Sequence, residues 1–480
     1  MVKCRRFEME TECLSEELEF QELSRRKVVS KFNGGTISTD AGALLLREVE
    51  AGKGILKSFS KCFVDYRNQK KIEHKLEELL SQRIYGIALG YEDLNDHDSL
   101  MSDRFLSVLC NKEDPTGQQR RCEEDKGKAL AGKSTLNRLE LTPSDATQKS
   151  RYKKIVYDKS QVEKYFVEMF LKSTDKQPSK IVLDLDATDD PLFGNQEGKF
   201  YHGYYGCYCY LPLYIFCGDQ LLCAKLRESG IDGSAGSKDE VERIVKEIRK
   251  EWPTVRIILR GDSGFCREEL MFWCEENEVE YIFGLSKNKR LKGMIEQEEE
   301  AAKQKHIETG KAARAFKDMT YKTLKSWSKH RRVIAKAEYL SKGANPRFVV
   351  TSLKAEEFGA KELYEKQYCA RGDMENRIKE QQLYLFADRT SAETMRANQL
   401  RLWFSSVAYI LLNELRRVGL RSTEMSGAQC HTIRNKLLKI GAQVRISVRR
   451  VFVSFASGCP YQDIYRQVYE NLRKAYPLIC

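Results

Sequence analysis

The chain has 480 residues, of which 41% are hydrophobic and 32% are charged. This length exceeds one ordinary compact domain and predicts two or three. Lys and Arg number 82 against 70 Asp and Glu, and the net charge of +12 favours an anionic partner, nucleic acid first. The 15 cysteines are an odd number in a large chain, which excludes a small disulfide scaffold. No CxxC pair is followed by a second, so we predict reduced, structural cysteines.

The sequence has no segment suited to export or membrane insertion. Residues 1–21 are polar and acidic, unlike a secretory signal peptide. The longest apolar run, residues 402–413, contains two serines and is too short to span a bilayer. We therefore expect a cytoplasmic protein.

The N-terminal part has helical patterns. Residues 1–30 are charged, and we expect them to form a loose segment. A Ser-Thr-Asp sequence at 38–40 precedes the apolar residues 41–46, which is typical of a capped helix start. Leucine and isoleucine recur near helical spacing over residues 70–89. These patterns predict a helical domain over residues 31–150.

The pattern changes to strands and helices near residue 175. The predicted order is three strands, then helix, strand, helix and strand, at 181–186, 200–216, 221–226, 238–250, 255–259, 267–277 and 281–285. This is the order of the ribonuclease H fold, a mixed sheet flanked by helices. We therefore expect an α/β core whose first part spans residues 175–289. Further strands are predicted at 332–335 and 348–351, and helix from 361 to 417.

Two aspartates stand at the ends of predicted strands. Asp186 closes the first strand and Asp262 closes the fourth, and strand ends in α/β sheets are where functional groups gather. A carboxylate there lowers stability unless it is solvated, paired or bound to a metal. Either residue alone is compatible with a solvated or capping aspartate. Asp184 shares a strand face with Asp186, so either of the two could be a metal ligand.

A third acid lies on the predicted helix after residue 361. Tyr368, Arg371 and Glu375 are spaced by three and four residues and form one stripe, which Gln382 continues. A solvated, salt-bridged helix face is the alternative interpretation. Three carboxylates from two strands and a helix suit two Mg²⁺ ions, which prefer oxygen ligands and serve phosphodiester chemistry.

Several motifs resemble those of a known family. The chain is similar to bacterial insertion-sequence transposases of the DDE class, above all to the insertion-sequence group numbered 1380. The resemblance covers residues 32–417 and rests on Thr39-Asp40-Ala41-Gly42, on 87–97, on 130–140, on Leu183-Asp184-Leu185-Asp186-Ala187-Thr188, on Tyr210-Leu211-Pro212-Leu213, on Arg260-Gly261-Asp262-Ser263-Gly264-Phe265 and on Glu375-Asn376-Arg377-Ile378-Lys379-Glu380.

The resemblance implies a site and a domain plan. It implies a ribonuclease H-like catalytic core with Asp186, Asp262 and Glu375 as catalytic and metal-binding acids, and it favours Asp186 over Asp184 because a small residue and a threonine follow. Related transposases have a lysine where this chain has Gln382. The implied plan is a DNA-binding domain at 31–150, an insertion at 290–352, the second part of the core at 353–420 and a C-terminal region at 421–480.

The implied activity is metal-dependent cleavage at the ends of an insertion sequence and strand transfer into target DNA. The expected cofactor is two Mg²⁺ ions, with Mn²⁺ possible, and the expected partners are terminal inverted repeats, target DNA and a second subunit in the synaptic complex. The bacterial cytoplasm, with nucleoid association, is the expected location. A transposase-derived DNA-binding protein without catalysis and a structure-specific nuclease are the alternatives.

Further residues are candidates for contacts with DNA. Tyr368, Arg371 and Lys379 lie on the glutamate helix. Two basic patches, at 321–332 and 433–450, also suit phosphates, and for each an ordinary solvated face is the alternative. From the first patch we select Trp327, Arg331 and Arg332.

Overall fold

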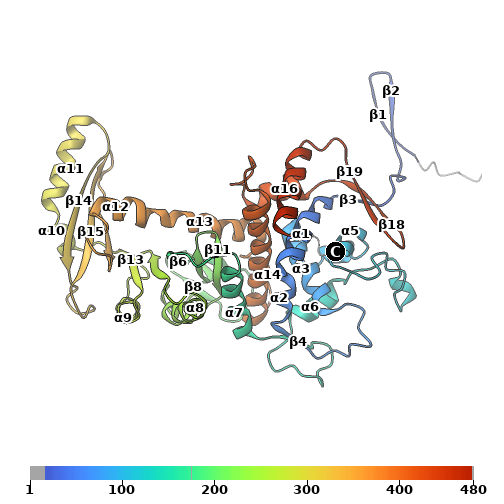
Figure 1. Ribbon diagram of the computed structural model, residues 1–480, viewed down its shortest axis with the longest axis horizontal. Coiled ribbons are helices and arrows are strands. Elements are labelled where there is room, and N and C mark those ends of the chain that lie inside the picture. Colours follow the sequence, from blue (N-terminus) through green and yellow to red (C-terminus); the bar gives the residue numbers. More distant parts are fainter. Residues whose placement is uncertain (1–16, 175, 478–480) are drawn as a thin grey trace, which may run out of the picture.

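The computed structural model describes residues 17–174 and 176–477. Figure 1 shows an elongated molecule with a large sheet towards one end and a mainly helical body towards the other. The long helix α14 (Met395–Glu414) stands between them. No helix within the described ranges combines the length and apolar character needed to cross a membrane.

The central sheet has the strand order expected for a ribonuclease H-like core. Five strands lie in the order β11-β10-β6-β12-β13; β10 is antiparallel to both neighbours, and β12 and β13 run parallel to β6. Their bounds are β6 (Lys180–Ala187), β10 (Leu213–Cys217), β11 (Gln220–Lys225), β12 (Arg256–Gly261) and β13 (Glu280–Leu285). The expected α/β fold class is therefore confirmed.

Alternation along the strands gives the sheet two different faces. Leu183 and Leu185 of β6 are buried in one cluster with α8 (Ser237–Glu251) and α9 (Glu268–Glu276). The opposite face, which includes Ile258 of β12, packs against the helical segment that begins near residue 360. Asp184 and Asp186 alternate with the two leucines, so they point towards that segment.

The predicted insertion continues the same sheet. It contains α10 (Lys289–Gly293), α11 (Glu296–Thr309), β14 (Ala313–Tyr321), β15 (Arg331–Leu340), β16 (Gly343–Ala344) and β17 (Arg347–Thr351). β17 pairs antiparallel with β13, and β15 and β14 follow outward. The added strands cover the edge that β13 would otherwise expose.

The aromatic stretch at 200–216, expected as one strand, contains three. β8 (Phe200–His202) and β9 (Cys207–Tyr210) form a separate small sheet with β7 (Asp190–Pro191), and only β10 joins the central sheet. A turn between β8 and β9 places Gly206 at φ 69°, a conformation that favours glycine. The backbone therefore reverses direction where composition alone predicts continuity.

Residues before 172 and after 395 share one hydrophobic core. α3 (Leu76–Leu89) and α14 are buried over most of their lengths, while α16 (Gln462–Ala475) contributes Val468 and Leu472. β18 (Ala442–Ile446) and β19 (Val451–Phe455) form a sheet with β3 (Ile37–Ser38). The Trp403 indole also donates to the Ala224 carbonyl oxygen of β11 at 2.9 Å. Thus α14, which we expected in the catalytic core, joins that core to the N-terminal body.

The remaining elements complete the helical body. Residues 18–30, expected to be loose, form an antiparallel hairpin of β1 (Leu18–Leu23) and β2 (Arg26–Ser30). Residues 1–16 of that expected segment lie outside the described residues. The other bounds are η1 (Ala41–Ala43), α1 (Leu44–Lys53), α2 (Ile55–Ser60), β4 (Phe63–Asp65), α4 (Asp96–Leu100), α5 (Arg104–Leu109), η2 (Glu123–Asp125), α6 (Lys133–Glu140), β5 (Ile155–Tyr157), α7 (Lys159–Leu171), η6 (Leu415–Gly419), α15 (Cys430–Ile433) and η7 (Arg434–Leu438).

Candidate active site

The parallel pairing of β6 and β12 brings the two predicted aspartates together. The register pairs Arg260 with Asp184 and Gly261 with Leu185. Asp262 is the next residue after Gly261, so it lies beside Asp186 at the same end of the sheet. Its Oδ1 accepts a hydrogen bond from the Gly264 amide at 2.8 Å, which holds the carboxylate over the turn after β12.

The third acid comes from the helical segment that covers this face. The segment consists of α12 (Ala360–Glu362), the π-helical η3 (Leu363–Tyr368), η4 (Cys369–Arg371), α13 (Gly372–Lys379) and the π-helical η5 (Glu380–Tyr384). The Arg371 guanidinium lies 3.3 Å from Asp186 Oδ2 and 2.6 Å from Glu375 Oε1. Arg371 therefore joins Asp186 of the strand to Glu375 of the helix, and its contact with Glu375 agrees with their predicted position on one helix face.

The electrostatics of Asp186 reflect this grouping. Burial raises the pKa of Asp186 to about 6; the positive charge of Arg371 opposes the rise, and the negative charges of Asp262 and Glu375 add to it. Asp262 and Glu375 are thus both close enough to Asp186 to act on it. Repulsion between such carboxylates makes the site receptive to a cation.

Asp184, the alternative to Asp186 as a metal ligand, is paired with a buried arginine. Its two oxygens are held by Arg260, with Nε–Oδ1 at 2.5 Å and Nη2–Oδ2 at 2.8 Å, and the Arg260 guanidinium also donates to the Gln367 carbonyl oxygen. Only 3% of Asp184 is exposed. Because both oxygens of Asp184 are paired with this guanidinium, Arg260 is held in place to tie the helical segment to the sheet, whereas Asp186 contacts Arg371 of that segment.

Tyr368 packs at the base of the site. A Cβ on Gly284 of β13 would lie 2.7 Å from the Tyr368 hydroxyl and 2.9 Å from the Ser263 amide. Burial raises the pKa of the Tyr368 phenol, with Arg371 opposing and Asp262 adding to the rise. The absence of a side chain at Gly284 therefore lets the helical segment and the Asp262 turn approach each other closely.

Gln382, which stands where relatives have lysine, ties the helical segment to the chain after Asp186. Its Nε2 donates to the Asp189 carbonyl oxygen at 3.0 Å and to Asp190 Oδ1 at 2.9 Å. Asp190 is fully buried, and this burial raises its pKa to about 8. Sequence reasoning did not identify Asp190; its only signal was a place four residues after Asp186.

The chemistry of the three acids suits a hard divalent cation, whereas their present arrangement does not enclose one. Asp186, Asp262 and Glu375 supply only carboxylate oxygens, the ligands that Mg²⁺ and Mn²⁺ prefer. Among residues 17–174 and 176–477, no three acidic, histidine or cysteine side chains are close enough to enclose an ion in this arrangement. The Arg371 guanidinium stands between two of the acids instead. Metal binding therefore requires Arg371 to give up at least one of these contacts.

The residues selected from the first basic patch are engaged in contacts within the protein. Arg331 is 4% exposed, and its guanidinium is held by Glu268 and Glu275. Trp327 is buried beneath it, with the guanidinium carbon 5.5 Å from the ring centroid. Arg332 pairs with Asp318 at 2.6 Å and donates to two carbonyl oxygens. The guanidinium groups of Arg331 and Arg332 are thus already paired within the protein, and the DNA contacts proposed for these residues stay a prediction.

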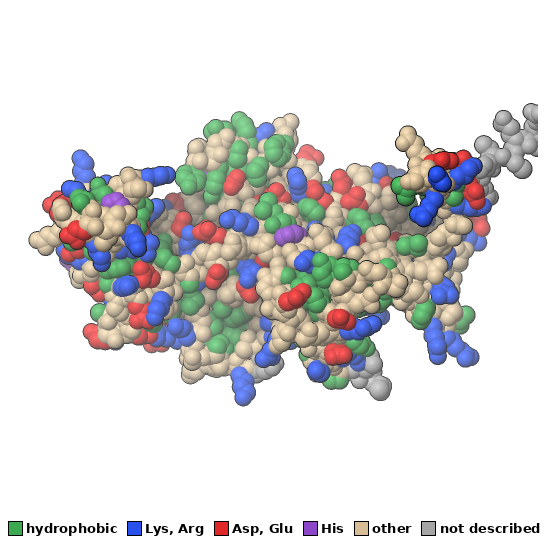
Figure 2. Space-filling model, turned by 90° about the horizontal axis from the view of Figure 1, so that it is seen from above, with side chains coloured by type: hydrophobic (Ala, Val, Ile, Leu, Met, Phe, Trp, Pro, Cys, Tyr) green, Lys and Arg blue, Asp and Glu red, His purple; other side chains and the backbone are tan. Residues whose placement is uncertain are grey.

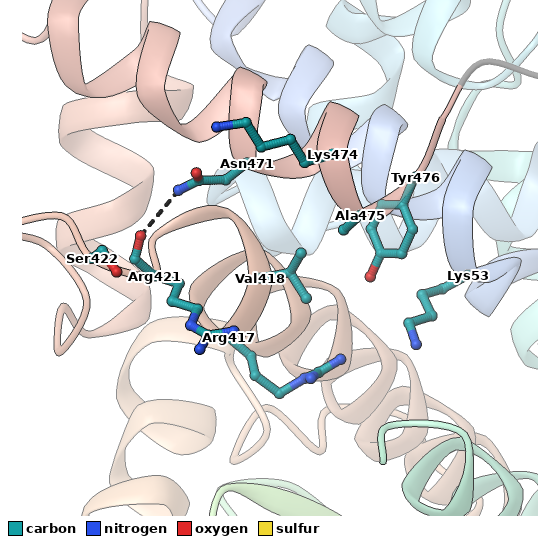
Figure 3. A pocket seen from close by; sticks show the side chains of 9 residues that line it. All are labelled: Lys53, Arg417, Val418, Arg421, Ser422, Asn471, Lys474, Ala475 and Tyr476. Atoms are coloured by element: carbon teal, nitrogen blue, oxygen red, sulfur yellow. Dashed lines mark hydrogen bonds between the residues drawn. The ribbon is translucent and has the colours of Figure 1, made fainter. Parts of the chain in front are cut away.

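A separate basic hollow lies within the helical body. It lies between η6 and α16 (Figure 3) and has a volume of about 520 Å³. Four of its lining residues are basic, namely Lys53, Arg417, Arg421 and Lys474. Asn471 crosses its rim to the Arg421 carbonyl oxygen at 3.0 Å. None of the three predicted acids lines this hollow, so it is not part of the candidate active site.

Comparison with known proteins identifies the family. A family model described as transposase DDE domain group 1 matches residues 20–477. The chain belongs to this family of DDE transposases. It is therefore a DNA transposase, an enzyme of divalent metal-dependent DNA cleavage and strand transfer.

Structural comparison gives a more distant likeness. A solved piggyBac transposase synaptic complex with hairpin DNA is similar over 92% of this chain and 86% of that chain, with 10% identity and a TM-score of 0.39. No curated protein sequence matches the chain. The fold assignment accordingly rests on the strand order and pairing of the central sheet.

Proposed function

We propose that Asp186, Asp262 and Glu375 are the catalytic acids of this transposase and hold two Mg²⁺ ions, with Mn²⁺ as a substitute. The observation that carries the proposal is the bridge from Arg371 to Asp186 and Glu375, beside the strand end that bears Asp262. A guanidinium shared by two carboxylates occupies a place suited to a cation. When bound, the two metal ions would activate a water or a 3′-hydroxyl and stabilise the leaving oxygen.

The surrounding residues would position DNA. Arg371, once released from the acids, is within reach of a phosphate at the same place, and guanidinium groups bind phosphate in a bidentate manner. Lys379 is exposed two turns further along the segment. The partly buried Tyr368 ring offers an apolar wall beside the reacting strand. These three residues are our proposed DNA contacts within the active site.

The proposed substrates are the terminal inverted repeats of an insertion sequence and a target duplex, with two subunits in the synaptic complex. We assign residues 31–150 to DNA binding, 175–289 and 353–420 to the catalytic core, and 290–352 to the insertion. The motifs around Asp186, Asp262 and Glu375 favour the insertion-sequence group numbered 1380.

A cleavage and joining assay tests the proposal. The purified chain is incubated with Mg²⁺, a labelled duplex carrying the ends of its own element, and a target duplex. Asp262→Ala and Asp186→Asn are expected to abolish both reactions and to retain DNA binding. Asp373→Asn is the matched control, because Asp373 is exposed on the same helix two residues from Glu375. Full activity of Asp262→Ala would overturn the assignment.

Metal binding gives a second readout that does not depend on activity. Titration of Mn²⁺, followed by electron paramagnetic resonance, is expected to show weaker binding in Asp186→Asn and Glu375→Gln than in Asp373→Asn. DNA binding by the wild type without cleavage would favour the non-catalytic alternative. Cleavage of many branched substrates without joining would favour the nuclease.

A further inference from the structure

The C-terminal region contains a two-stranded ribbon that is rooted in the protein at one end. β18 and β19 pair antiparallel from Ala442 opposite Phe455 to Ile446 opposite Val451. At the root, β18 also pairs with β3, and the Val444 amide donates to the Thr36 carbonyl oxygen at 2.9 Å. The ribbon is therefore held in a defined orientation.

The tip of the ribbon is a closed, exposed turn. The Ser447 amide donates to the Arg450 carbonyl oxygen at 2.9 Å, and the Arg450 amide donates to the Ser447 hydroxyl at 3.2 Å. Val448 and Arg449 lie between them; Val448 is fully solvent-exposed, and Arg449 is exposed. Figure 1 shows β18 and β19 at the opposite end of the molecule from β14 and β15.

The two faces of the ribbon differ in chemistry. One face packs on the protein through Ala442 and Val444, which are buried, and through Phe455, whose ring lies 5.2 Å from that of Tyr465. Alternation places a different set on the outer face. That set is Gln443, Arg445 and Ser447 of one strand beside Ser454, Phe452 and Arg450 of the other.

The outer face and the tip carry positive charge without compensation. From residue 425 to residue 462 the chain has no Asp or Glu and six Lys or Arg. Two of the six are used internally, since Lys439 pairs with Asp40 at 2.6 Å and Arg434 donates to carbonyl oxygens of α3. Arg445, Arg449 and Arg450 form no ion pair with any acid in the described ranges.

Other parts of the surface carry basic and acidic residues together. Figure 2 shows basic and acidic side chains intermingled over much of the face that it presents. In α8, for example, the exposed Lys246 and Lys250 each pair with a glutamate of the same helix, Glu242 and Glu247. The ribbon is distinctive because its three arginines lie in a stretch, residues 425–462, that contains no acid.

We propose that the outer face and tip of the β18–β19 ribbon form a binding site for duplex DNA. This site rests on the proposed function, because it presumes that the chain engages DNA outside its acidic centre. A two-stranded ribbon has the width of the major groove of B-form DNA. Arginines on its outer face and tip contact phosphates or guanine edges, and Gln443 and the two serines supply further hydrogen bonds.

Phe452 also fits this use. Its side chain is 59% exposed, and the Arg445 guanidinium carbon lies 5.6 Å from its ring centroid. The ring keeps the guanidinium extended across the ribbon without neutralising its charge. A protein partner would instead be expected to bury a continuous apolar patch, which the outer face does not have.

The salt dependence of DNA binding tests this site. The probe is a mixed-sequence 30-base-pair duplex, and affinity is measured by fluorescence anisotropy in EDTA between 50 and 200 mM salt. The triple variant Arg445→Gln, Arg449→Gln, Arg450→Gln should lower the slope of log affinity against log salt by about 2.7, at about 0.9 for each phosphate contact. The advantage of the wild type over this variant then shrinks by about 40-fold across that range.

The matched control removes the same charge elsewhere. Lys305, Lys311 and Lys342 are exposed in the insertion, and their triple replacement by Gln also lowers the net charge by three. The proposed site would be refuted if the slope of log affinity against log salt changed equally in both triple variants, or if it did not change in the ribbon variant. A changed sedimentation coefficient of the DNA-free ribbon variant would assign the surface to contacts between protein subunits instead.

Cleavage at saturating DNA separates this proposal from that of the active site. The ribbon variant should cleave at the wild-type rate when DNA is saturating at low salt, because its acids are intact. Asp262→Ala should bind with the wild-type salt slope and fail to cleave. Loss of cleavage in both, with normal binding in both, would refute the ribbon site and leave the catalytic assignment standing.

Discussion

Replacement of Asp190 by Asn should remove a pH dependence from the stability of this protein. Asp190 is fully buried and receives one hydrogen bond from Gln382, and its Oδ2 has no partner among the described residues. Burial raises its pKa from 3.8 to about 8. Asn keeps the shape and the acceptor for Gln382, but it does not titrate.

The direction in which stability changes with pH follows from where the Asp190 proton is bound. Between pH 4 and pH 8 the folded protein holds the Asp190 proton and the unfolded chain does not, so wild-type stability falls as pH rises through this window. One proton corresponds to about 1.4 kcal/mol per pH unit, which gives about 2.7 kcal/mol between pH 5 and pH 7. With an unfolding entropy near 1 kcal/mol/K for a chain of this length, the corresponding shift in Tm is about 3 °C.

The assay compares wild type and Asp190→Asn by thermal unfolding at pH 5, 6 and 7 in EDTA. The difference in Tm between variant and wild type should grow by about 3 °C from pH 5 to pH 7, because other titrating groups are common to both. Parallel pH profiles would show that Asp190 titrates at its ordinary pKa, and the argument from burial would fail.

Three further substitutions test the packing around the site. Gly284→Ala places a Cβ 2.7 Å from the Tyr368 hydroxyl and should slow single-turnover cleavage by about 100-fold with DNA affinity unchanged; an unaltered rate would refute the tight approach. Glu380→Ala leaves the buried Arg416 without its carboxylate and should destabilise the fold by about 3–5 kcal/mol, so an unchanged Tm would contradict the role of this ion pair. Asp184→Asn weakens the ion pair with Arg260 and should lower Tm. The variant that remains folded should still cleave DNA, which distinguishes Asp184 from Asp186.

Local sequence patterns predicted the order along the chain of the strands and helices in the central α/β core, except that residues 200–216 contain three strands and not one. Strands of alternating or apolar residues and helices of period 3.6 depend on contacts within a few residues, so the segments around Asp186 and Asp262 could be placed before any tertiary contact was known. The spacing of Tyr368, Arg371 and Glu375 likewise predicted one helical stripe. The choice of Asp186 over Asp184 came from the family resemblance and not from spacing.

Only the tertiary structure decided which charged groups are available for function. Arg331 lies in a basic patch by sequence, yet two glutamates from α9 neutralise it, and those glutamates are more than fifty residues away along the chain. Arg445 lies in a patch of the same appearance and has no such partner in the described chain. Ion pairing and burial depend on residues distant in sequence, because they are set by how strands and helices pack, and composition therefore identified both patches without distinguishing them.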